Sequence, residues 1–295
     1  MSLEFSQFAH QCRTRVDQAL DLYLPPNEDT TRLRAAMRYS LFNGGKRVRP
    51  ILAYASALAI DPAIELGRID PVSCALECLH SYSLVHDDLP AMDDDELRRG
   101  KPTCHIAFNE ASAILAGDGL QTLAFELLTR TDLPAQTQVR LIRALAAGAG
   151  AEGMVLGQAI DLAAVDQQLD LAQLENMHRH KTGALIRASV AMGAISAGAS
   201  DAQLVALDRY AAAIGLAFQV QDDILDVTGD TTTLGKQQGA DIARNKPTYV
   251  SLLGLQQARA KAKELHHQAE EALASLGENA LYLHQLARYI VHRSN

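Results

Sequence analysis

Two aspartate-rich segments hold the residues of this sequence best suited to chemistry. The first runs His86-Asp87-Asp88-Leu89-Pro90-Ala91-Met92-Asp93-Asp94-Asp95, and the second runs Gln221-Asp222-Asp223-Ile224-Leu225-Asp226. Both lie within apolar helical sequence, where several carboxylates would be costly to hold together without cations between them. Oxygen ligands in this number favour Mg²⁺, which commonly keeps several waters and completes its coordination with substrate phosphate oxygens. The segments therefore predict a phosphate or diphosphate substrate bound through Mg²⁺.

The second segment fits one face of a helix. At about 100° per residue, Asp222 and Asp226 lie about 40° apart and Asp223 and Asp226 about 60° apart, so one face carries all three. A single acidic cluster is more often a solvated face or a helix cap. Two clusters with apolar flanks favour a metal site instead.

The first segment does not fit a straight helix. Asp87 and Asp93 would lie about 120° apart on such a helix. Pro90 also removes an interior N–H. We therefore expect the helix to bulge or end near Leu89.

Basic residues lie where they could hold the expected anion. Segment 43–50, Asn-Gly-Gly-Lys-Arg-Val-Arg-Pro, puts three cations beside a glycine pair that allows a ligand close to the backbone. It is not a nucleotide P-loop, because Ser40 stands at the first glycine position and no Ser or Thr follows Lys46. An exposed basic turn is the alternative. Further donors are the pair Arg98-Arg99, segment 178–183 and Lys236.

Composition excludes several classes of partner. The net charge of −8 over 295 residues argues against nucleic acid and against an anionic membrane surface. We find no signal peptide and no stretch of transmembrane length, so we expect a cytoplasmic protein without membrane insertion. Cys74 and Cys78 lie four apart, but a zinc site would need two more ligands at suitable spacing, and none is evident. We therefore expect the four cysteines to be reduced and to serve in packing. They are Cys12, Cys74, Cys78 and Cys104.

Apolar residues are spaced as in helices almost throughout the chain, with abundant Ala and Leu. Segments 140–162, 204–227 and 249–276 are predicted to be long helices. Connections are predicted at Pro25-Pro26, Asp61-Pro62, Leu133-Pro134 and 229–239, and 229–239 is also a candidate lid. No strong repeat or linker is present, so we expect one domain over residues 1–295. The predicted fold is an all-α bundle with a central apolar cavity between facing helices.

These pieces occur together and in order, and they carry a resemblance over nearly the whole chain. The sequence closely resembles the short-chain trans-prenyl diphosphate synthases, and among them the bacterial members with a fifteen-carbon product. The matching segments are 44–50, 76–93, 97–103, 153–158, 181–183 and 215–226. The resemblance implies an all-helical isoprenoid-synthase bundle, usually a homodimer. It also implies that an allylic diphosphate is joined to isopentenyl diphosphate with loss of diphosphate, using three Mg²⁺ ions per substrate-bound site.

The resemblance also assigns roles by motif position. Direct Mg²⁺ ligands would be Asp87, Asp93 and Asp222, with Asp88, Asp223 and Asp226 nearby. The allylic diphosphate would be held by Arg98, Lys181 and Lys236. Isopentenyl diphosphate would be held by Lys46, Arg49, His80 and Arg99. Lys181, Thr182 and Gln219 would stabilise the allylic cation, and Lys246 resembles a lid lysine.

Some of these assignments have alternatives. His80 could be a core histidine whose hydrogen bonds are satisfied within the protein. Gln158 and Asp161, three apart on one helical face, either support the metal ligands or are ordinary polar residues of a helix.

Product length is expected to depend on the helix that precedes Asp87. The growing chain should point away from the metals, down that helix. In the resembled family, a fifteen-carbon product goes with a bulky residue five positions before the first aspartate and with a two-residue insertion. Here the bulky residue is Tyr82 and the insertion is Pro90-Ala91. Ser83, at the fourth position, is small and does not favour ten carbons. Tyr82 as a simple core aromatic is the alternative.

Three other functions share parts of this pattern. A geranylgeranyl diphosphate synthase of the same family would differ only in product length. A terpene cyclase would not need the Lys46 and Arg49 site, and its second metal motif normally mixes Asn, Ser or Thr with acids. A non-enzymatic Mg²⁺-binding helical scaffold would not need basic residues beside both aspartate segments. Fold alone does not separate these possibilities.

Overall fold

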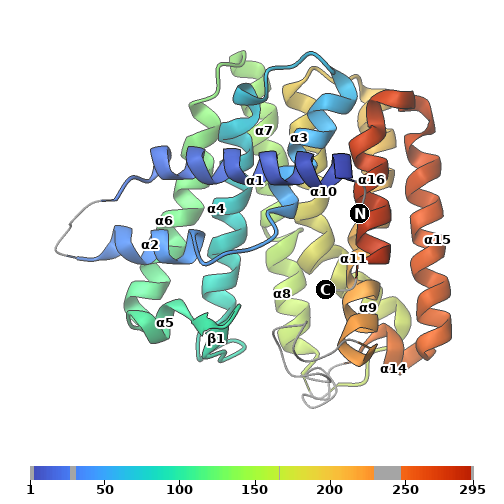
Figure 1. The fold of residues 1–295 in the computed structure, drawn as a ribbon. Coiled ribbons are helices and arrows are strands. Elements are labelled where there is room, and N and C mark those ends of the chain that lie inside the picture. The colour runs from blue at the N-terminus through green and yellow to red at the C-terminus, as the bar shows by residue number, and fades with distance from the viewer. Residues whose placement is uncertain (1–2, 27–30, 166, 229–246, 294–295) are drawn as a thin grey trace.

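The computed structural model describes residues 3–26, 31–165, 167–228 and 247–293. Helices form most of these residues (Figure 1). The first half contains α1 (Leu3–Tyr23), α2 (Leu33–Leu41), α3 (Val48–Ile60), η1 (Leu66–Ile69), α4 (Asp70–Asp87), α5 (Cys104–Ala107), α6 (Glu110–Thr129) and α7 (Ala135–Ala149). The second half contains α8 (Met154–Ala163), α9 (Leu171–His178), η2 (Arg179–Gly183), α10 (Ala184–Ser196), α11 (Asp201–Thr228), α14 (Tyr249–Leu253), α15 (Leu255–Leu273), η3 (Ala274–Ala280) and α16 (Leu281–His292).

The predicted all-α class is confirmed. In the described part, the strands are limited to an antiparallel hairpin of β1 (Leu97–Arg98) and β2 (Lys101–Pro102). None of the described helices is long and apolar enough to cross a membrane. The expected single domain and the expected apolar cavity stay predictions.

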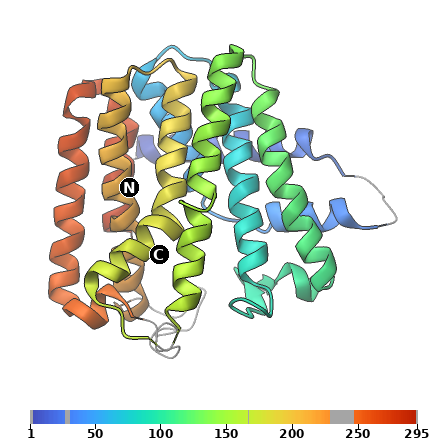
Figure 2. The ribbon, with the colours of Figure 1, turned by 180° about the vertical axis from the view of Figure 1, so that it is seen from behind.

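Helices α4 and α11 position the two aspartate segments. α4 packs against α6, and α11 packs against α15. α4 is apolar on most sides, since Cys74, Leu76, Cys78 and Leu79 are all fully buried. Both α4 and α11 run toward the lower side of the molecule in the two ribbon views (Figures 1 and 2). The aspartates at their C-terminal ends therefore come to the same end of the bundle.

Helix boundaries agree with the sequence at some places and differ at others. The helix expected over 204–227 is confirmed by α11, and α4 ends at Asp87, close to the expected break at Leu89. The single helix expected over 140–162 is wrong. α7 ends at Ala149 and α8 begins at Met154, because Gly150 and Gly153 form a tight turn in which a Cβ on Gly153 would overlap carbonyl oxygens of α7.

The helix expected over 249–276 is also wrong. Gly254 has φ +78°, a left-handed conformation that separates α14 from α15. The apolar periodicity continues across this glycine, so periodicity alone did not reveal the break.

Candidate active site

The first aspartate segment folds back on the end of α4. Asp93 N donates to Asp87 O at 2.9 Å, and Asp95 N donates to Asp88 O at 3.2 Å. Asp94 has φ +51°, which allows the chain to reverse. The turn brings Asp93 near Asp87, in agreement with the helix end predicted near Leu89.

Asp87 lies in a partly buried polar cluster. Gln158 donates to its Oδ1, and Lys181 Nζ lies 3.6 Å from its Oδ2. The same Nζ donates to Asp161 Oδ2 at 2.6 Å. Burial raises the pKa of Asp87, Lys181 opposes that shift, and Asp93 adds to it. Gln158 and Asp161, whose roles the sequence left open, therefore contact the predicted site residues.

Lys181 is carried by the π-helical turn η2 (Arg179–Gly183). π-turns are frequent at functional sites, but nothing in the sequence pattern predicted this one. Gly157 lets α8 pack closely against η2, since a Cβ at this position would overlap Lys181 N. Thr182 is partly buried in the same turn. Gln219 Nε2 lies 3.4 Å from His178 Nδ1, one residue before η2.

Asp88 is engaged by an arginine of the hairpin. Arg98 Nε lies 2.8 Å and 2.9 Å from the two carboxylate oxygens of Asp88, which is only 3% exposed. Burial raises the pKa of Asp88, and its hydrogen bond and charge interaction with Arg98 oppose that shift. The adjacent Arg99 points the other way and donates to Gly44 O.

The second aspartate segment contacts the C-terminal part of the chain. Arg293 donates to Asp222 Oδ1 at 2.5 Å, and its guanidinium lies 4.0 Å from the Phe218 ring centroid. Asp223 Oδ2 accepts from Tyr249 N at 2.7 Å, so it caps the start of α14. Asp226 is partly buried one turn beyond Asp222. Sequence reasoning missed Arg293, which lies 71 positions from Asp222.

The aspartates suit Mg²⁺ by their chemistry. Among the described residues, no three His, Cys, Asp or Glu side chains form a compact group that could hold a metal ion. Mg²⁺ does not need such a group, since it is bound through one or two carboxylates with waters and substrate phosphates. Asp87 meets this requirement, because its carboxylate is partly buried and the charge of Asp93 acts on it. The donor set therefore fits the metal.

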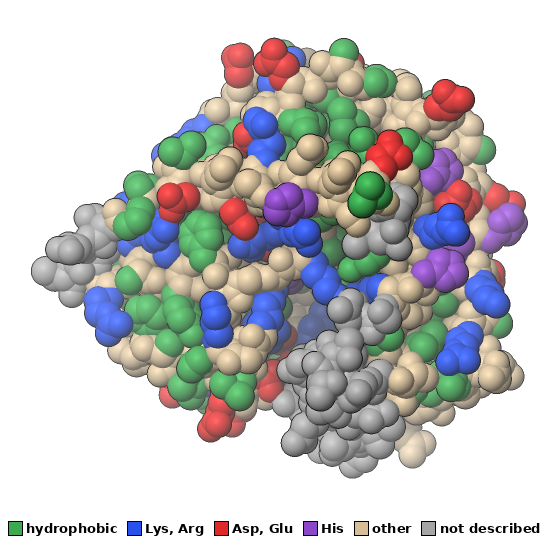
Figure 3. All heavy atoms as spheres, viewed as in Figure 1, with side chains coloured by type: hydrophobic (Ala, Val, Ile, Leu, Met, Phe, Trp, Pro, Cys, Tyr) green, Lys and Arg blue, Asp and Glu red, His purple; other side chains and the backbone are tan. Residues whose placement is uncertain are grey.

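A cationic cluster lies around the loop of residues 42–47 between α2 and α3, which we call the Gly44 loop. In the described structure, Arg49 Nε and His80 Nδ1 are buried and have no hydrogen-bond partner. Burial lowers the pKa of Arg49 to about 10 and that of His80 well below its usual value, and neighbouring arginines add to both shifts. Partial desolvation of the ammonium group, together with the charge of Arg293, lowers the pKa of Lys46. His80 therefore fits a role in binding an anion better than the role of a core histidine. Figure 3 shows Lys and Arg side chains gathered around a hollow just below α1.

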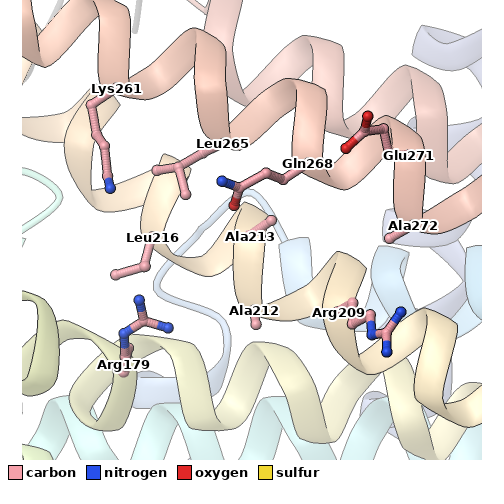
Figure 4. A pocket seen from close by; sticks show the side chains of 10 residues that line it. All are labelled: Arg179, Arg209, Ala212, Ala213, Leu216, Lys261, Leu265, Gln268, Glu271 and Ala272. Carbon is pink, nitrogen blue, oxygen red and sulfur yellow. The ribbon is translucent and has the colours of Figure 1, made fainter.

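Another hollow, of about 490 Å³, opens between α11 and α15 (Figure 4). Arg179 and Lys261 from opposite sides line it, and each lies 3.2 Å from Glu175. None of the predicted site residues lines this hollow. It is therefore distinct from the aspartate segments.

The remaining predictions concern product length and the lysines near the second aspartate segment. The Tyr82 ring packs edge-on against His86, with centroids 5.0 Å apart. Ser83 Oγ donates to His80 O at 2.8 Å. Lys236, Lys246 and the candidate lid 229–239 lie outside the described residues.

Comparisons with known proteins identify the family of this chain. The model of the polyprenyl synthetase family matches residues 30–281. The farnesyl diphosphate synthase of Escherichia coli is 50% identical over 99% of this chain and 100% of that protein, and the Haemophilus influenzae enzyme of the same name is 47% identical over 99% of each. Among solved structures, a putative farnesyl-diphosphate synthase from Marinomonas has a TM-score of 0.83 at 48% identity, covering 99% of each chain. An FPP/GFPP synthase from Zymomonas mobilis has a TM-score of 0.88 at 41% identity, covering 99% of this chain and 100% of that one.

The fold and the site thus define a helical prenyl-transferring enzyme. The chain belongs to the polyprenyl synthetase family.

Proposed function

We propose that this enzyme condenses dimethylallyl or geranyl diphosphate with isopentenyl diphosphate, releasing diphosphate and giving (2E,6E)-farnesyl diphosphate. One observation carries the proposal. The neighbouring residues Arg98 and Arg99 contact the two candidate sites, Arg98 at Asp88 and Arg99 at Gly44 O. The aspartate segment and the cationic loop therefore lie side by side, as two diphosphates that react with each other require.

The allylic diphosphate is assigned to the aspartate side. Asp87, Asp93 and Asp222 would hold Mg²⁺, with Asp88, Asp223 and Asp226 supporting them, and we propose three ions in the substrate-bound enzyme. When bound, Mg²⁺ neutralises charge on the leaving diphosphate. Lys181, Arg98 and Lys236 would donate to the same diphosphate.

The protein's own groups then guide the carbon chemistry. As the carbon–oxygen bond breaks, oxygen atoms of Thr182, Gln219 and the Lys181 backbone would stabilise the allylic cation. The alkene of isopentenyl diphosphate, held by Lys46, Arg49, His80 and Arg99, attacks that cation. The resulting cation loses a proton to the departed diphosphate. Water must be excluded throughout, and we propose that 229–239 and Lys246 close the site.

We also propose that the enzyme is a homodimer joined through α6 and α7. Ile114 and Leu115 on α6 are 43% and 56% exposed, and Val139 on α7 is 63% exposed. An interface between two copies of the chain would cover these exposed aliphatic side chains. Light scattering on the purified protein would measure the mass of the assembly.

One domain over 1–295 and a cytoplasmic location stay predictions from the sequence.

The proposal is tested by incubating the purified protein with dimethylallyl and isopentenyl diphosphates and Mg²⁺. We expect diphosphate release and, after dephosphorylation, farnesol. EDTA should abolish turnover and added Mg²⁺ should restore it. Asp87→Ala should lower turnover by about three orders of magnitude or more, with helix content unchanged by circular dichroism. Release of diphosphate without a prenyl chain longer than five carbons would contradict the proposal.

A further inference from the structure

One cation of the Gly44 loop has been given no role in catalysis or binding. Arg47 is 5% exposed, unlike its exposed neighbour Lys46. Its guanidinium donates to Glu77 Oε1 at 2.7 Å, Asp17 Oδ1 at 2.9 Å and Leu41 O at 2.7 Å. These contacts tie the start of α3 to α1, α2 and α4.

The backbone at Arg47 is held in an uncommon conformation. Its φ of +52° lies in the left-handed region, which a residue other than glycine rarely occupies. Such a conformation persists only where its surroundings hold it in place. The contacts of Arg47 therefore hold the loop that carries Lys46 and the first turn of α3, which carries Arg49.

Glu77 is the second partner in this arrangement. It is 2% exposed on α4, and its Oε2 is buried without a hydrogen-bond partner in the described structure. Burial lowers the pKa of Arg49 and of Arg99, and the charge of Glu77 opposes that shift in each. The charge of Glu77 thus acts on both arginines. Among the described residues, no carboxylate forms an ion pair with either of them.

We propose that Arg47 is a positioning residue for isopentenyl diphosphate. By pairing with Glu77 it keeps that buried carboxylate from engaging Arg49 and Arg99, whose guanidinium groups then remain available to the diphosphate. Removing one partner of a buried pair leaves an uncompensated charge, whereas removing both is far less damaging. The inference rests on the proposed function, since isopentenyl diphosphate is the ligand.

The test uses Arg47→Met, Glu77→Gln and the double variant, with isopentenyl diphosphate binding measured by calorimetry and KM measured for each substrate. Arg47→Met should weaken binding of isopentenyl diphosphate by about tenfold or more, because Glu77 then competes for Arg49 and Arg99. The KM for geranyl diphosphate should change by less than about twofold. The double variant should recover most of the lost affinity, because no unpaired carboxylate remains.

Glu77→Gln keeps the proposal testable if Arg47→Met does not fold. Arg47 would retain Asp17 and Leu41 O, so isopentenyl diphosphate should bind at least as tightly as to the wild type. A tenfold loss in Glu77→Gln, or a double variant as weak as Arg47→Met, would overturn the inference.

The matched control is the Arg15–Asp70 pair, which also joins α1 to α4, at 2.6 Å and 2.9 Å. Asp70→Asn should lower the unfolding temperature without changing the affinity for isopentenyl diphosphate. A wild type that neither binds nor consumes isopentenyl diphosphate would refute the proposed function itself. Normal wild-type binding with an unchanged Arg47→Met variant would refute only the inference.

Discussion

Tyr82 is the residue expected to limit product length. It lies on α4 five positions before Asp87, half-buried and edge-on to His86. Replacing it by Ala should deepen the pocket by about the volume of a ring, and apolar cavities accept apolar chains readily. We expect farnesyl diphosphate from the wild type and substantial geranylgeranyl diphosphate from Tyr82→Ala. Chromatography of the dephosphorylated alcohols measures both.

The control for Tyr82 is Tyr82→Phe, which keeps the ring and should keep the fifteen-carbon product. An unchanged product from Tyr82→Ala would place the floor of the pocket elsewhere.

Single residues differ in how far the sequence reveals them. Asp87 and Lys181 were predicted as site residues because their motifs are local in sequence, and the structure brings them to 3.6 Å. Arg293 and Glu77 were missed because their contacts join distant segments. Arg293 reaches Asp222 across 71 positions, and Glu77 reaches Arg47 across 30. Local spacing carries no information about such pairs.

At the scale of elements, the packing of α8 against η2 positions Lys181. A Cβ on Gly157 would overlap backbone atoms of η2, which cannot rotate away. Gly157→Ala should therefore cost about 1–3 kcal/mol of unfolding free energy through overpacking. Because Lys181 would move from Asp87, turnover should also fall by about tenfold or more. Urea unfolding and steady-state kinetics measure the two effects.

Gly119→Ala is the matched glycine variant. Its Cβ would meet only the flexible side chain of Met37, so stability and turnover should stay close to wild type. Wild-type turnover in Gly157→Ala would show that this close approach does not position Lys181.

Elements were also predicted unevenly from the sequence. α11 was predicted to within three residues because its apolar spacing is continuous and no glycine interrupts its exposed side. The turn between α7 and α8, the break at Gly254 and the π-turn η2 were not predicted. Each of these three features depends on a tertiary contact or on a single backbone angle. The apolar periodicity of the sequence indicates only which face of a helix is buried.

For the whole molecule, a buried histidine links folding to pH. His178 is 8% exposed, and burial lowers its pKa from 6.5 to about 4. Between those values the unfolded chain binds a proton at this residue and the folded chain does not. Stability should therefore fall as pH decreases from 6.5 toward 4, by up to about 1.4 kcal/mol per pH unit from this group.

Urea unfolding at pH 7, 6 and 5 measures this dependence. His178→Gln should lose less stability than the wild type over that range. His267→Gln should behave as the wild type, because the His267 side chain is 74% exposed. Equal pH dependence in His178→Gln and the wild type would contradict a neutral buried His178.

The central claim is that the two diphosphates occupy separate ends of one site, and substrate-resolved kinetics of Lys46→Ala and Lys181→Ala tests it most directly. Lys46→Ala should raise the KM for isopentenyl diphosphate by about tenfold while kcat changes little, because its target carries the same charge throughout the reaction. Lys181→Ala should lower kcat by about a hundredfold, because its target gains charge in the transition state. The same kinetic defect in both variants would contradict the division of the site.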